Sequence, residues 1–328
     1  MKSTRGEDMR AALACKQPPS AVPVWELEFQ AWDNVSGRHL VLGREFAALS
    51  SAEKEKTMHA NAEIIISVCR RLHFAALTMP GCYWETAPGV PAYYWLPDGD
   101  REKQIAILKR LCESEGILTV VNRSSLVQMP GSADNYEEFC YMLMDRPEEM
   151  DAHAGRLLES AIETAKRLAD AGHEAVLTAS DIADNRGLFF SPAQMDRWFF
   201  PHLEKWASAL KKLGLFSILH TDGNISAIVE KLAASPLDAV QALDPVAGMD
   251  IAEVKQKTQG RLCLCGNIES GLLMTGVPAA IYEKTRATLA ACKAGGGYVL
   301  GASNACYPAT PPENYAALLA AWQEHGQY

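Results

Sequence analysis

The sequence predicts an α/β fold: a single (β/α)8 TIM barrel with an N-terminal helical extension, spanning residues 1–328 as one domain. Eight short apolar segments recur along the chain with helical segments between them, the order of elements found in such a barrel. The apolar segments are near-continuous rather than alternating, which is typical of parallel strands buried on both faces. A chain of 328 residues is long enough for one barrel-sized domain.

The expected strands are the eight apolar segments. In chain order they cover residues 22–29, 74–79, 117–121, 175–179, 215–220, 238–243, 261–265 and 297–301. The alternative is a doubly wound open sheet, which should carry a glycine-rich phosphate-binding turn after an early strand. No such turn is present, and the barrel is therefore favoured.

The expected helices fill the intervals between the strands. They cover residues 51–71, 101–115, 146–171, a stretch that begins at 191–192, and then 224–234, 250–259, 278–294 and 311–325. Ser191 has the character of an N-cap, and Pro192 suits the first helical position. Pro201 lies further along the same stretch and should kink or break it.

The charge balance excludes some classes of function. The chain carries 40 acidic and 31 basic residues, a net charge of −9, which argues against non-specific binding of nucleic acid. Its longest uncharged run, residues 294–312, contains glycines and prolines, so we expect no helix that spans a membrane. The N-terminus lacks the apolar core of a signal peptide, and an odd number of cysteines, 9, indicates free thiols. We therefore expect a cytoplasmic protein.

Polar side chains gather at the expected C-terminal ends of the strands, where barrel enzymes carry their active sites. We predict catalytic roles for Glu28, Asp181, His220 and Asp222. We predict substrate-binding roles for Glu26, Asn267, Asn304 and, in the long loop after the second strand, Tyr83 and Trp84. Each has a structural alternative: the aspartates can cap turns, a lone histidine is usually structural, and aromatic side chains can pack a loop instead of covering a substrate.

Four short motifs carry a resemblance to a known family. They are Ser191-Pro192 with Pro201-His202, His220-Thr221-Asp222-Gly223-Asn224, Cys265-Gly266-Asn267-Ile268-Glu269 and Thr310-Pro311-Pro312-Glu313-Asn314. In this order they resemble the uroporphyrinogen decarboxylase superfamily, and the similarity extends from about Val22 to the C-terminus. The resemblance implies a (β/α)8 barrel with its site at the C-terminal mouth, in agreement with the strand pattern.

One branch of the superfamily is uroporphyrinogen decarboxylase itself, a cofactor-free enzyme of haem synthesis. Its tetrapyrrole substrate carries many carboxylates, which call for arginines. In the family's first-strand motif this chain matches at Trp25, whereas Glu28 and Trp32 stand at the two arginine positions. The aspartate expected after the second strand is missing too, because residues 74–80 are uncharged. This branch is the alternative rather than the first choice.

The other branch consists of corrinoid-dependent methyltransferases, which commonly hold zinc with a His-x-Cys pair and a later Cys. Here His220 matches, Asp222 stands at the first Cys position, Asn304 stands at the second, and Cys306 follows two residues later. Zinc accepts nitrogen, oxygen and sulfur ligands. The resemblance thus implies a possible zinc site, and the candidate ligands are His220, Glu28, Asp222 and Cys306.

The function we expect is a methyltransferase or O-demethylase component that acts on a small methylated substrate. Its corrinoid would be carried by a separate partner protein, and Asp181 and Asn267 would orient the substrate. The alternatives are a decarboxylase of the tetrapyrrole type and a non-catalytic barrel that binds a tetrapyrrole or a partner protein. Relatives in this superfamily often form dimers, which implies a possible homodimer.

Overall fold

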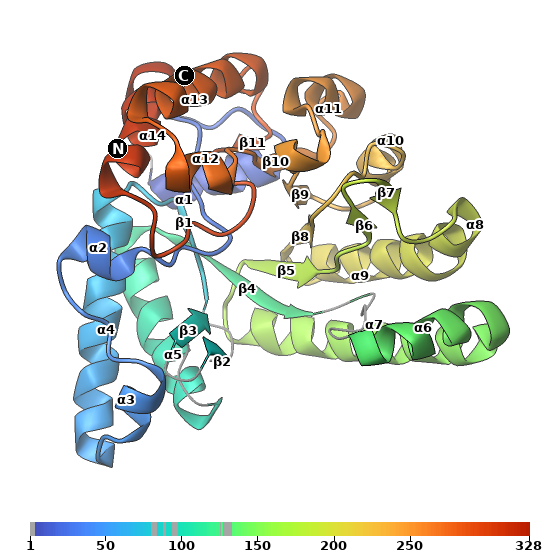
Figure 1. Ribbon diagram of the computed structural model, residues 1–328, viewed down its shortest axis with the longest axis horizontal. Coiled ribbons are helices and arrows are strands. Elements are labelled where there is room, and N and C mark those ends of the chain that lie inside the picture. The colour runs from blue at the N-terminus through green and yellow to red at the C-terminus, as the bar shows by residue number, and fades with distance from the viewer. Residues whose placement is uncertain (1–3, 80–83, 88–89, 94–97, 125, 127–132) are drawn as a thin grey trace.

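The computed structural model describes residues 4–79, 84–87, 90–93, 98–124, 126 and 133–328. Its centre is a curled sheet of seven strands in the order β1-β4-β5-β8-β9-β10-β11, all paired in parallel (Figure 1). The bounds are β1 Ala76–Thr78, β4 Leu118–Ser124, β5 Ala175–Ala179, β8 Phe216–Thr221, β9 Ala239–Ala242, β10 Cys263–Gly266 and β11 Tyr298–Val299. The predicted α/β barrel class is confirmed.

The prediction of a regular strand over residues 22–29 is wrong. The segment nevertheless lies between the two edge strands of the seven-stranded sheet and takes the place of an eighth strand. Val24 makes single parallel bridges to Phe74 on one side and to Leu300 on the other. These bridges connect the two edges of the sheet, next to β1 and β11, and so close the barrel. Pro23 has no N–H to donate, which interrupts the ladder that a regular strand would need.

The N-terminal extension covers the end of the barrel at which the strands begin. Helix α1 (Arg5–Leu13) buries Met9 and Leu13 in the same apolar cluster as the inward-facing side chains of the strands, such as Leu118 and Ile218. The N–H of Gly6 donates to the carbonyl of Gly116, just before β4. This end of the barrel is therefore filled, and the opposite end is left for a site. Two short helices follow, α2 (Trp32–Ser36) and α3 (Gly43–Ala47).

The remaining helices surround the sheet (Figure 1). Their bounds are α4 Ser51–Arg71, α5 Asp98–Glu115, α6 Ala133–Asp145, α7 Pro147–Asp170, α8 Pro192–Gln194, α9 Phe200–Lys212, α10 Val229–Ala234, α11 Ile251–Thr258, α12 Ser270–Thr275, α13 Pro278–Cys292 and α14 Pro312–His325. No helix in the described part of the chain is long and apolar enough to cross a membrane.

Several local predictions can be compared with these bounds. Ser191 caps α8 in a reciprocal pair with Gln194, as its sequence indicates. A π-turn over Met195–Phe199 precedes Pro201, so the expected irregularity is present. The helix expected from residue 224 begins only at Val229, because the Asn224 side chain accepts from the N–H two residues later and forms a turn instead.

Two small antiparallel hairpins were not predicted. They lie in the loops after β1 and β5, and their strands are β2 Trp84–Ala87 with β3 Val90–Tyr93, and β6 Ala183–Asp184 with β7 Gly187–Leu188. Strands of two to four residues are too short to show a periodic pattern in the sequence.

Candidate functional site

The candidate site lies at the C-terminal end of the barrel. On β8, Ile218 belongs to the apolar cluster inside the barrel, whereas Leu219 belongs to the cluster between the sheet and the helices. His220, two residues after Ile218, therefore also faces the inside. Asp181 follows β5, the neighbour of β8 in the sheet, and Asp222 follows β8 itself. Sheet order thus brings these three side chains to one place.

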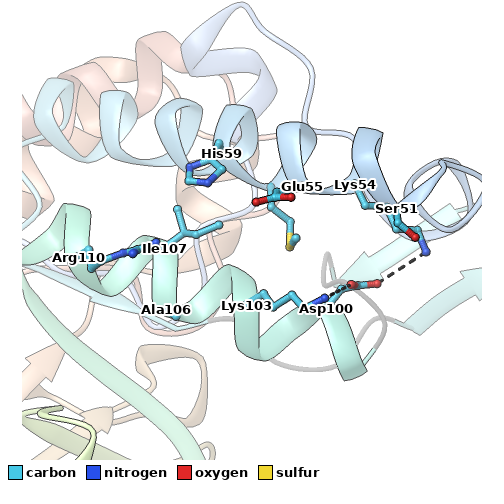
Figure 2. Close-up of a pocket in the computed structure, with 10 residues that line it drawn as sticks. Ser51, Lys54, Glu55, His59, Asp100, Lys103, Ala106, Ile107 and Arg110 are labelled. Atoms are coloured by element: carbon cyan, nitrogen blue, oxygen red, sulfur yellow. Dashed lines mark ion pairs between the residues drawn. The ribbon is translucent and has the colours of Figure 1, made fainter.

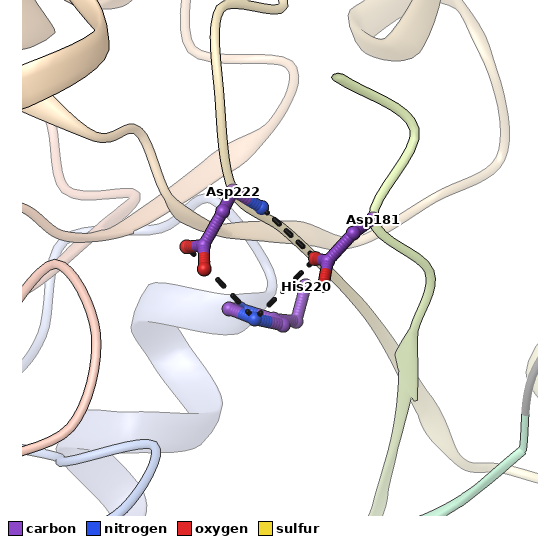
Figure 3. A group of neighbouring side chains, drawn as sticks. All are labelled: Asp181, His220 and Asp222. Carbon is purple, nitrogen blue, oxygen red and sulfur yellow. Dashed lines mark hydrogen bonds and ion pairs between the residues drawn. The ribbon is translucent and has the colours of Figure 1, made fainter. Parts of the chain in front are cut away.

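Asp181, His220 and Asp222 point toward one another, as Figure 3 shows. Nε2 of His220 is 3.8 Å from Oδ1 of Asp181 and 4.0 Å from Oδ1 of Asp222. The backbone N–H of Asp222 donates to Oδ1 of Asp181 at 3.1 Å, which ties the two strand ends together. His220 is buried, with 8% of its surface exposed, whereas the Asp181 side chain reaches solvent. The cluster is open to the mouth on the Asp181 side.

The Asp222 carboxylate is only half satisfied by the protein. Its Oδ2 accepts from Nδ2 of Asn304 at 2.6 Å, while its Oδ1 is buried and has no hydrogen-bond partner among the described residues. Burial raises the pKa of Asp222, the charge of His220 lowers it, and the charges of Asp181 and Asp244 raise it again. A buried carboxylate oxygen without a donor is costly, and a bound cation would relieve that cost.

The three side chains fit the requirements of a divalent metal such as zinc. They offer one imidazole nitrogen and two carboxylate oxygens, and these ligand atoms all lie within 4.8 Å of one another. Ligand atoms around a tetrahedral zinc are roughly 3.4 Å apart, given bonds of about 2.1 Å. The observed separations of 3.8 and 4.0 Å thus need only sub-ångström adjustment. Three protein ligands also leave a position for substrate, as catalytic zinc requires.

Glu28 and Cys306, predicted as further metal ligands, do not belong to this cluster among the residues searched. Cys306 is buried in the apolar cluster outside the sheet, and burial raises the pKa of its thiol well above the ordinary value. The zinc-binding form of cysteine is the thiolate, so this environment opposes ligation. Glu28 accepts a hydrogen bond from the Gln30 amide at 3.2 Å. The pKa of Tyr307 is raised by burial and then by the negative charges of Glu28 and Asp222. Because Tyr307 is near both carboxylates, Glu28 adds negative charge near the mouth.

Glu26, predicted to bind substrate, lies on the outer side of the barrel wall. Its Oε2 accepts from the N–H of Ala302 at 2.9 Å, and its Oε1 accepts from the Tyr315 hydroxyl at 2.8 Å. Only 3% of its surface is exposed. Burial raises the pKa of Glu26 to about 7, although both hydrogen bonds lower it. These contacts join the closing segment of the barrel to helix α14.

The other predicted binding residues differ in what surrounds them. Nδ2 of Asn267 donates to the carbonyl of Leu243 at 2.9 Å, and its Oδ1 is buried without a hydrogen-bond partner in the described part of the chain. Asn304 holds Asp222, and its own Oδ1 accepts from the next backbone N–H. Tyr83 lies outside the described residues. Trp84 lies in β2, where only the backbone is described.

One residue of the site was missed from the sequence. Gln241 lies on β9 in register with His220, and its side-chain oxygen is 2.5 Å from Nδ1 of the imidazole. Its strand was predicted, but a glutamine inside an apolar run gave no reason to connect it with a histidine 21 residues earlier. The strand pairing of β8 with β9 supplies that connection.

A hollow of about 560 Å³ lies on the outside of the barrel between α4 and α5 (Figure 2). Side chains of both signs line it, and Asp100 pairs with Lys54 at 3.7 Å and with Lys103 at 3.8 Å. The residues that line it include none of those predicted for the site. It is therefore separate from the cluster at the mouth.

A family model for uroporphyrinogen decarboxylase (URO-D) matches residues 124–325, which is more than half of the chain and includes the whole cluster. The chain belongs to the uroporphyrinogen decarboxylase family. The resemblance seen in the four short motifs is thereby confirmed. The curated relatives of this chain include more than one kind of enzyme.

Two of these relatives represent the two branches. Methylcobamide:CoM methyltransferase MtaA of Methanosarcina barkeri is 28% identical over 167 residues, 51% of this chain and 46% of that protein. Uroporphyrinogen decarboxylase 2 of Arabidopsis thaliana, a chloroplastic protein, is 27% identical over 204 residues, 61% of this chain and 49% of that protein. The chain spans about half the length of these relatives. Sequence identity therefore does not favour either branch strongly.

A solved structure shares the fold over nearly the whole chain. The methyltransferase from Methanosarcina mazei superposes with a TM-score of 0.73 at 19% identity, covering 98% of this chain and 99% of that one. At this identity the similarity establishes the barrel fold.

Proposed function

We propose that this chain is a methyltransferase that moves a methyl group between a small methylated compound, such as an O-methyl compound, and a corrinoid on a separate partner protein. The observation that carries the proposal is the cluster of Asp181, His220 and Asp222 at the mouth of the barrel. The similarity of the chain to a methylcobamide:CoM methyltransferase supports the reaction class. The substrate class is proposed from the chemistry of this site, and the similarity to a methylcobamide methyltransferase supports the corrinoid part of the proposal.

In this proposal Asp181, His220 and Asp222 hold zinc, with Nε2 as the imidazole ligand. When bound, zinc supplies Lewis-acid polarisation of the substrate oxygen, which makes an alkoxide or phenoxide a better leaving group. Asn304 orients the Asp222 carboxylate through its amide N–H. The amide oxygen of Asn267, which has no hydrogen-bond partner among the described residues, would accept a hydrogen bond from the substrate. The buried setting of His220 keeps bulk water away from one side of the site.

The charge of the mouth supports a small neutral substrate over a polycarboxylate. Asp181 and Asp244 both raise the pKa of Asp222, so three carboxylates act on the same space, and Glu28 adds a fourth nearby. A tetrapyrrole with many carboxylates would be repelled from such a mouth unless cations compensated. A metal would be attracted by the same charges.

The metal is tested by measuring zinc content after exhaustive dialysis. Wild-type protein should retain roughly one equivalent of zinc per chain, as a three-ligand site does. His220→Ala should lose it, because the imidazole is the buried ligand of the cluster. His59→Ala is the matched control, since His59 is an exposed histidine on α4, and its zinc content should equal that of wild type. Retention of zinc by His220→Ala would remove this residue as a ligand.

The reaction is tested with zinc-loaded protein under anaerobic conditions. Incubation with a panel of aryl methyl ethers and reduced cobalamin should give methylcobalamin, which is followed by its visible absorbance. The same protein should convert uroporphyrinogen to coproporphyrinogen at a negligible rate. Robust decarboxylation without methyl transfer would overturn the proposal in favour of the decarboxylase branch.

A further inference from the structure

We infer that Gln241 is a positioning residue that holds His220 in the tautomer required of a metal ligand. The inference rests on the proposed metal site, but it makes a claim about the metal-free protein that can be measured by itself. Gln241 is 2% exposed and lies on the inner face of β9, in register with His220 on β8. It touches the imidazole on the side away from the two aspartates.

The orientation of the Gln241 amide is determined by its other neighbours. Its Nε2 lies 3.4 Å from the carbonyl oxygen of Ala302 and 3.3 Å from that of Ser303. Carbonyl oxygens can only accept, so the amide nitrogen, which can only donate, must face them. The amide oxygen is thereby directed at Nδ1 of His220, 2.5 Å away. The reverse orientation would place oxygen against two carbonyl oxygens.

The amide oxygen in turn determines where the imidazole carries its proton. An amide oxygen only accepts, so Nδ1 must be the protonated nitrogen, and Nε2 of the neutral ring then holds a lone pair. That lone pair faces Oδ1 of Asp181 at 3.8 Å and Oδ1 of Asp222 at 4.0 Å, both longer than a hydrogen bond. Three acceptor atoms that face one another repel unless a cation or a proton lies among them. In metal sites, the acceptor that binds the second ring nitrogen of a histidine ligand in the same way sets the tautomer and the orientation of the ring.

The same backbone segment holds both sides of the cluster. Ala302 and Ser303 orient Gln241, and the next residue, Asn304, donates to Asp222. Residues 302–304 follow β11, two strands away from β9 in the sheet. The position of His220 and the position of Asp222 are therefore set by one support, which the order of strands β8 to β11 in the curled sheet brings to the site.

The tautomer is tested by nitrogen-15 NMR of metal-free protein with labelled histidine, at a pH where the ring is neutral. His220→Gln identifies the His220 signals by their loss. Wild type should show the Nδ1–H tautomer at His220. Gln241→Met lacks the acceptor against Nδ1 and should lose this tautomer. Gln256→Met makes the same change at an exposed position of α11 and should leave the spectrum unchanged.

Zinc affinity, measured by competition with a chromophoric chelator, gives the second readout. Gln241→Met should bind zinc about 10- to 100-fold more weakly than wild type, the usual effect of losing such a partner. An Nε2–H tautomer in wild type, or an unchanged tautomer and zinc affinity in Gln241→Met, would overturn the inference. If Gln241→Met does not fold, the wild-type spectrum still tests the inference, because an Nε2–H tautomer at His220 would overturn it. An Nδ1–H tautomer in a protein that binds no zinc would refute the proposed metal site and leave the role of Gln241 standing.

Discussion

Glu26 is a buried carboxyl group whose ionisation should make the stability of this protein depend on pH. It joins the closing segment of the barrel to α14 through Ala302 and Tyr315, and burial raises its pKa to about 7 from an ordinary 4.5. The folded protein therefore binds this proton more tightly than the unfolded chain does. The resulting stabilisation is complete below pH 4.5, falls as the pH rises, and is lost above about pH 7.

The magnitude follows from the difference between the two pKa values. A difference of about 2.5 corresponds to roughly 3 kcal/mol of unfolding free energy, since one pKa unit is about 1.4 kcal/mol. In Glu26→Gln the amide oxygen can still accept from Ala302, and the amide nitrogen can donate to the Tyr315 oxygen. The variant keeps the contacts without the buried charge. It should be more stable than wild type by up to roughly 3 kcal/mol at pH 8 and by only about 1 kcal/mol or less at pH 5.

Urea unfolding followed by circular dichroism at pH 5, 6.5 and 8 measures this difference. Glu159→Gln is the matched control, because Glu159 is an exposed glutamate on α7 and its replacement should change stability little at any of these pH values. If Glu26→Gln differs from wild type by the same amount at pH 5 and pH 8, the buried-charge explanation is refuted. A variant that is less stable at pH 8 would refute it as well.

Gly223→Ala and Ser191→Ala test the local geometry, and Gly260→Ala is the control for the first. Gly223→Ala should destabilise the protein by roughly 1–3 kcal/mol and weaken zinc binding, because Gly223 has φ +85° and a Cβ there would lie 2.6 Å from the Ala183 carbonyl, next to the site. Gly260→Ala, at φ +70° with open space around it, should leave zinc binding unchanged, and equal zinc affinities in the two variants would contradict this reasoning. Ser191→Ala should lower the unfolding free energy by about 1 kcal/mol through loss of the helix cap, and an unchanged urea midpoint would show that the cap contributes nothing.

Local sequence patterns predict most of the regular elements because each depends on neighbours along the chain. The expected helix over 51–71 and the expected strand over 175–179 have the same bounds in the structure. The cap at Ser191 was also predictable, since a cap bonds to residues three positions away. The prediction of a regular strand over residues 22–29 was wrong because its structure depends on distant segments rather than on neighbours along the chain. That segment is apolar like a strand, but its hydrogen bonds depend on two edges of the sheet that lie far away in sequence.

The sequence by itself determined the barrel class, the family resemblance and the set of polar residues at the strand ends, among them Asp181, His220 and Asp222. Only the tertiary structure decided which of them meet. Strand order and register bring these three side chains together and add Gln241, while Cys306 is packed on the other side of the barrel wall. The physical reason is that a contact between two strands depends on how the sheet pairs and closes, and no local pattern along the chain records that closure.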